Sequence, residues 1–69
     1  MKTIKVYYNV KNNIFDIGHI NAVELPISED TYKWLLNKNS VVKQTLANTI
    51  VNIARLQGFQ YAEITEIHY

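Results

Sequence analysis

The chain has 69 residues, no cysteine, and a formal net charge of +1 from seven Lys and Arg against six Asp and Glu. A chain of this length forms one domain, and it buries only about 60% of the surface of its unfolded state. The lack of cysteine excludes disulfides and thiolate zinc sites, so we expect a reducing, cytoplasmic setting. The near-neutral charge gives no strong field to attract nucleic acid. No apolar run fits a signal peptide or a membrane span.

The first part of the chain predicts two strands. Residues 2–10 alternate between apolar and polar side chains, as in a half-buried strand, and the inner face holds Ile4, Val6, Tyr8 and Val10. Residues 11–13 predict a hairpin turn because asparagine tolerates a positive φ. A second strand is predicted over residues 14–25, with a bulge or a bend at Gly18, and one phase of it holds Phe15, Ile17, Val23 and Leu25.

An amphipathic helix follows the second strand. Pro26 ends the strand, and Ser28 is a good N-cap for a helix that runs to about Asn37. Trp34 falls on the polar side of this helix, whose predicted buried face holds Tyr32, Leu35 and Leu36.

A second helix is predicted to begin at a cap supplied by Ser40 or Thr45 and to end at Gly58. Its apolar side chains spread past half of the helix circumference, so we expect it to be covered on two sides. The last strand is predicted over residues 59–68. Its Glu63 and Glu66 match Lys2 and Lys5 of the first strand, which indicates that the first and last strands are neighbours.

The element order β-β-α-α-β predicts a single α+β domain over residues 1–69, in which a three-stranded sheet packs against a helical hairpin. No motif for catalysis is present: there is no nucleophile elbow, no phosphate-binding glycine loop and no metal-spaced histidine cluster. Asp16 with His19, and Glu66 with His68, pair at spacings that occur by chance on strands. We therefore expect a protein that is not an enzyme and that has no cofactor or metal.

The segment over residues 23–56 has a short strand that ends in Leu25-Pro26, a Thr45-Leu46 step, and apolar residues at Ile50 and Ile53. This pattern resembles the ribbon-helix-helix DNA-binding family, in which the Ser/Thr-Leu step opens the second helix. The resemblance implies a strand-paired dimer that reads bases with the polar side chains of its strands and holds a phosphate at the start of the second helix. At the base-reading positions this chain has Ala22 and Glu24, and a glutamate there would repel phosphates.

Two surfaces are candidates for binding a partner. Tryptophan and tyrosine are the residues that most often anchor protein interfaces, and the first candidate surface is Trp34 with Lys33, Asn37 and Lys38, joined by Tyr7 or Tyr61 if one face of the sheet is bare. The second candidate is a strip along the second helix formed by Gln44, Asn48, Asn52 and Arg55, which offers amide hydrogen bonds to a partner helix, a twin subunit or bases.

We expect a small protein-binding module that occupies a surface of a larger host protein and so inhibits or redirects it. The chain is rich in Asn, Ile, Lys and Tyr, which AT-rich genomes favour, and this composition points to a phage or another mobile element and to host-defence or regulatory targets. The alternative is a dimeric transcriptional regulator of the ribbon-helix-helix type that binds DNA. A further alternative is a structural subunit, in which the apolar arc of the second helix is buried against a sister chain in a homodimer.

Overall fold

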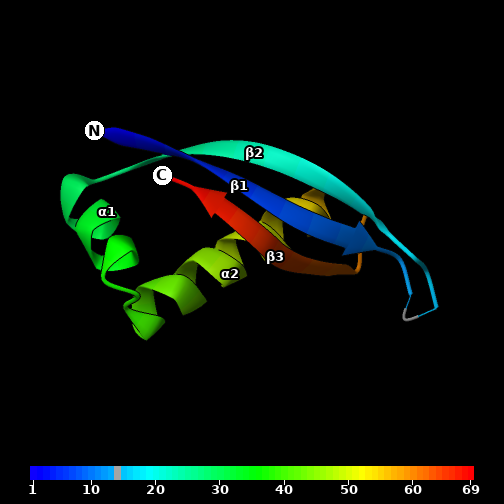
Figure 1. The fold of residues 1–69 in the computed structure, drawn as a ribbon. Coiled ribbons are helices and arrows are strands. Elements are labelled where there is room, and N and C mark those ends of the chain that lie inside the picture. Colours follow the sequence, from blue (N-terminus) through cyan, green and yellow to red (C-terminus); the bar gives the residue numbers. More distant parts are fainter. Residues whose placement is uncertain (14) are drawn as a thin grey trace.

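The computed structural model describes residues 1–13 and 15–69, and its element order confirms the predicted α+β fold. The elements are β1 (Lys2–Lys11), β2 (His19–Ile27), α1 (Glu29–Leu36), α2 (Ser40–Leu56) and β3 (Tyr61–His68). The three strands form one antiparallel sheet in the order β2-β1-β3, and α2 crosses one face of it (Figure 1). Within the described ranges, no helix has both the length and the apolar character that crossing a membrane requires.

The core lies between the central strand β1 and the two helices. The predicted inner face of β1 is confirmed, since Ile4, Val6, Tyr8 and Val10 are all fully buried. The helices cover these side chains with Leu35, Leu46, Ile50 and Ala54. The buried Tyr8 hydroxyl donates a hydrogen bond to Gln57 Oε1 at 3.1 Å, so this polar group in the core is satisfied.

The prediction that the first and last strands are neighbours is confirmed. The lysine–glutamate pairing on which that prediction rested is wrong. Lys5 lies opposite His68, and Glu66 lies opposite Tyr7. The register shifts between Tyr7 and Tyr8, because β3 carries the extra residue Thr65 there as a β-bulge. Thr65 Oγ1 donates a hydrogen bond to the Tyr7 carbonyl oxygen at 3.1 Å.

The predicted second strand is wrong in its first part. Pairing with β1 begins only at His19, which lies opposite Val10, so the segment before it belongs to the hairpin loop. Phe15 and Ile17 therefore do not lie in the sheet, and residue 14 lies outside the described residues. The predicted bend at Gly18 is a positive φ of 78° immediately before β2.

The helix ends agree with the sequence in part. The Thr31 backbone N–H donates to Ser28 Oγ at 3.1 Å, which confirms the predicted cap of α1. The cap of α2 is Asn39, whose Oδ1 accepts from the Val42 N–H at 3.1 Å, so the prediction of Ser40 or Thr45 is wrong. The last strand begins at Tyr61, two residues after the predicted start at residue 59.

Two apolar side chains predicted to be covered, Leu36 and Leu56, are exposed. Leu36 is exposed because α1 has only two turns and reaches the core through Leu35, which lies one helical step before it. Leu56, the last residue of α2, is also exposed, and so is Val41 near the start of the helix, for which no cover was predicted. In the single chain, α2 is buried along the side that faces the sheet, through Leu46, Ile50 and Ala54. The prediction that other elements cover this helix on two sides is therefore wrong at the C-terminal end of the helix.

Candidate functional site

The predicted aromatic surface lies on α1 and on the turn that follows it. Trp34 is 50% exposed, and Lys33, Asn37 and Lys38 are exposed beside it. The backbone here forms a closed turn, in which the Asn39 N–H donates to the Trp34 carbonyl oxygen at 2.9 Å and Lys38 takes a positive φ of 58°. A large aromatic side chain is thus presented to solvent on a hydrogen-bonded turn.

The sheet has an open face on the side away from α2. It carries the outward side chains of the three strands, which include Lys5, Tyr7, Asn9, Lys11, Ile20, Ala22, Glu24, Tyr61, Glu63, Glu66 and His68. Tyr7 contacts the His68 ring at 4.9 Å between centroids, and Lys5 Nζ lies 5.4 Å from the Tyr7 ring centroid. Tyr61 lies opposite Lys11, the last residue of β1, whereas Tyr7 lies opposite Glu66 near the middle of that strand. The structure therefore does not bring Tyr7 and Tyr61 together.

The charges on the open face are mixed. Lys5 and Lys11 are accompanied by Glu24, Glu63 and Glu66, so this face has no excess of positive charge for a phosphate backbone. The Thr45-Leu46 step also differs from the ribbon-helix-helix pattern: it lies in the second turn of α2, where Thr45 Oγ1 donates to the Val41 carbonyl oxygen at 3.0 Å. The helix start that would hold a phosphate in that family is therefore not at this step.

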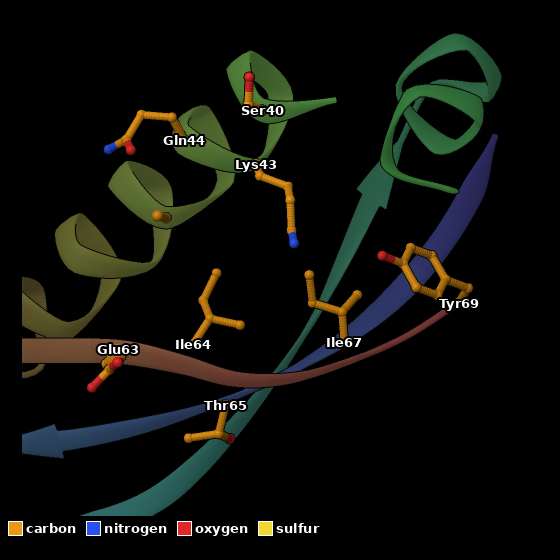
Figure 2. Close-up of a pocket in the computed structure, with 9 residues that line it drawn as sticks. Ser40, Lys43, Gln44, Glu63, Ile64, Thr65, Ile67 and Tyr69 are labelled. Atoms are coloured by element: carbon orange, nitrogen blue, oxygen red, sulfur yellow. The ribbon is translucent and has the colours of Figure 1, made fainter. Parts of the chain in front are cut away.

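The second candidate surface, the strip of Gln44, Asn48, Asn52 and Arg55, is exposed along α2. Gln44 Nε2 donates to Asn48 Oδ1 at 3.3 Å, so part of its hydrogen-bonding capacity is used within the helix. Beside the strip, an open groove of about 610 Å³ separates α2 from β3. Figure 2 shows Ile64 and Ile67 pointing into this groove beneath Lys43, with Glu63 and Thr65 on the far side of β3.

Two apolar side chains that the sequence assigned to a strand, and not to a site, are almost fully exposed in the hairpin. Phe15 is 91% and Ile17 is 94% exposed. They belong to the loop between β1 and β2, which we call the hairpin tip (residues 12–13 and 15–18), and this loop projects beyond the helices at one end of the molecule (Figure 1). The tip and α1, the helix that carries Trp34, lie at opposite ends of a structure that measures 37 × 20 × 17 Å (Figure 1).

Short hydrogen bonds hold the hairpin tip in shape. Asn13 Oδ1 accepts from the Phe15 N–H at 2.9 Å, and Asp16 Oδ1 accepts from the Gly18 N–H at 3.0 Å. Asp16 Oδ2 accepts in addition from the Asn12 N–H at 3.2 Å. The first two are Asx turns, in which the side chain bonds a backbone N–H two residues on. Asp16 with Gly18 two residues later is the sequence signal that favours the second of these turns.

The electrostatics of the tip centre on Asp16. The N–H of Gly18, followed by that of Asn12, stabilises the charged carboxylate and holds the pKa of Asp16 below its usual value. His19 and Lys11 act in the same direction with smaller effects. The carboxylate is therefore ionised at neutral pH, and its two oxygens bond the loop backbone.

The histidine–carboxylate pairs noted in the sequence have ordinary surroundings. His68 Nε2 lies 3.0 Å from Glu66 Oε1 on the solvent-exposed open face. His19 packs edge-on against Phe59, with 5.2 Å between ring centroids. Across residues 1–13 and 15–69, no three His, Asp or Glu side chains come together in a way that could hold a metal ion.

Comparison of the chain with models of known protein families, with curated proteins and with solved structures finds no match in any of the three.

Proposed function

We propose that this protein is a small, non-enzymatic protein-binding module whose hairpin tip inserts into an apolar cleft of a larger protein. The observation that carries the proposal is the near-complete exposure of Phe15 and Ile17 at 91% and 94%. Apolar side chains that are almost fully exposed on one loop gain from being covered by a partner, since each then loses its contact with water. An aromatic and an aliphatic anchor on a narrow arm match an apolar cleft better than a flat surface.

The hydrogen bonds of the tip support this role. Asn13 Oδ1 bonds the Phe15 N–H, and the Asp16 carboxylate bonds the N–H groups of Asn12 and Gly18, before any partner arrives. A preformed loop loses less conformational entropy on binding than a mobile one, so more of the contact energy remains as affinity. The same bonds occupy the Asp16 carboxylate, which reduces the cost of bringing its charge close to an apolar partner.

The proposed action is steric. An arm that fills a cleft of a larger protein blocks whatever that cleft binds, and this inhibits or redirects the target without any chemistry. The composition noted above favours a mobile element as the source and a host-defence or regulatory protein as the target. Trp34, at the opposite end of the long axis, is a second contact for a target large enough to reach both ends.

The experiment is an affinity capture from a bacterial host lysate, divided into nuclease-treated and untreated halves. Three baits are compared: the wild type, the double variant Phe15→Ser/Ile17→Ser, and the control Val41→Ser, which removes an apolar side chain that is 73% exposed at the start of α2. We expect one protein in stoichiometric amount on the wild type and on the control. We expect the double variant to reduce its capture by about tenfold or more.

Two outcomes would contradict the proposal. Equal capture of the same protein by all three baits would show that the tip is not the contact. Recovery of an enriched DNA fragment that is lost with nuclease or with added salt would instead establish the DNA-binding alternative.

A further inference from the structure

The strand β3 lies at an edge of the sheet and has one side of its backbone unpaired. The order β2-β1-β3 leaves two edges, those of β2 and β3. Pro26 interrupts the edge of β2, because proline has no N–H to donate to a new strand. In contrast, β3 contains no proline and borders the groove of about 610 Å³ beneath α2. Of the two edges, β3 is thus the one whose backbone no proline interrupts.

The bulge at Thr65 gives β3 an unusual arrangement of side chains. Glu63 and His68 are an odd number of positions apart, so they would lie on opposite faces of a regular strand. The extra residue returns them to the same face: Glu63 lies opposite Asn9 and His68 opposite Lys5, both outward residues of β1. For the same reason Ile64 and Ile67 both face α2, since they lie opposite the buried Tyr8 and Val6.

This arrangement is complementary to itself. If β3 of a second copy runs antiparallel with the two-fold axis between Thr65 and Glu66, then Glu63 lies opposite His68 and Ile64 lies opposite Ile67 of the other copy. Each pair joins side chains of the same face, and each occurs twice. Glutamate with histidine forms a hydrogen-bonded pair, and two isoleucines pack. His68 already contacts Glu66 through Nε2 at 3.0 Å, so its other ring nitrogen, Nδ1, is the one that would bond Glu63 of the other copy.

The side chains at the ends of the pairing also fit. In the same register Ala62 lies opposite Tyr69 of the other copy. Tyr69 lies on the helix side, where its ring is 6.0 Å from that of Tyr32, and a small residue opposite a large one leaves room for the ring. A shift of two residues that keeps the faces matched places Glu63 opposite Glu66 instead, and this repulsion disfavours the alternative register.

We infer that the protein forms a two-fold dimer in which the β3 strands of two copies pair antiparallel and make one continuous sheet. Both α2 helices then lie on the same face of this sheet, and the groove above Ile64 and Ile67 is the space in which they approach each other. The two hairpin tips point to opposite ends of the assembly, since β1 of one copy runs antiparallel to β1 of the other. This dimer is independent of the partner binding proposed above, because it needs no other protein.

The test is sedimentation velocity over a wide range of protein concentration, with charge variants on the open face. We expect the wild type to change from monomer to dimer as its concentration rises. Glu63→Lys places a lysine next to His68 of the other copy and raises the dissociation constant by about tenfold or more. The double variant Glu63→Lys/His68→Glu exchanges the partners and restores the constant to within about threefold of the wild type. Both residues are exposed, and circular dichroism of each variant verifies the fold.

Glu24→Lys is the matched control, since it makes the same charge change on the same face but at the other edge strand. It leaves the dissociation constant unchanged if β3 is the interface. A wild type that stays monomeric at every concentration overturns the inference. So does a dimer that Glu24→Lys weakens and Glu63→Lys does not, or a double variant that fails to regain the dimer.

Discussion

Asp16 Oδ1 accepts a hydrogen bond from the backbone N–H of Gly18 at 3.0 Å, and this contact closes the hairpin tip next to the first residue of β2. It links the acidity of one carboxyl group to the shape of the loop that presents Phe15 and Ile17. A side chain that bonds its own backbone in this way replaces the strand pairing that the alternating sequence otherwise favours.

The first prediction concerns the pH dependence of this loop. The folded-state pKa of Asp16 is lowered by the Gly18 and Asn12 N–H groups, so the stabilisation is fully present above the unfolded value of about 3.9 and is lost as the pH falls through the folded value. In an NMR titration we expect the Asp16 carboxyl carbon and the Gly18 amide to shift together, with a midpoint below that of an unstructured aspartate. In Asp16→Asn the amide shift disappears. A midpoint at the ordinary aspartate value contradicts the prediction.

The second prediction compares the two glycines of the chain. Gly18 has a φ of 78°, and a Cβ there would lie 2.6 Å from the Val10 carbonyl oxygen. Gly58 has a φ of 94°, but a Cβ there would meet nothing within 4 Å. We expect Gly58→Ala to lower the free energy of unfolding by about 1 kcal/mol, from backbone strain alone. Gly18→Ala adds a clash with backbone and costs about 2 to 3 kcal/mol.

Urea unfolding followed by circular dichroism measures both glycine variants under identical conditions. Equal losses for the two would show that the loop adjusts to the added methyl group, and the tip would then be less firmly held than its hydrogen bonds indicate.

Much of the fold could be predicted because the deciding signals are local. The alternation of Ile4, Val6, Tyr8 and Val10 identifies the buried face of β1, and the Ser28 hydroxyl identifies the start of α1. The exposure of Trp34 follows from helix periodicity around a core that Leu35 reaches. These features depend on spacing along one element and need no knowledge of what packs against it.

The features that were predicted wrongly depend on distant partners. Phe15 and Ile17 continue the apolar alternation that Val23 belongs to, so the sequence alone extends the strand through them. The pairing of β2 with β1 ends at His19, and no part of β1 remains to pair with Phe15 and Ile17. Leu36 differs from Leu35 by one helical step, yet the extent of the core decides which of the two is covered. The bulge at Thr65, which reverses the faces of β3, has no sequence signal that we could identify.

The last prediction concerns Trp34, the single tryptophan of the chain, which reports on the end of the molecule opposite the hairpin tip. Because it is 50% exposed, acrylamide quenches its fluorescence in the folded protein, and unfolding in urea increases the quenching further. If the target covers both ends, binding reduces the quenching, and Trp34→Ala lowers the affinity by about 2 kcal/mol, as for an aromatic anchor. Leu36→Ala, a change of an equally exposed side chain on the same helix, serves as the control. Unchanged quenching in a complex that still requires Phe15 and Ile17 would confine the contact to the hairpin end and exclude Trp34 from it.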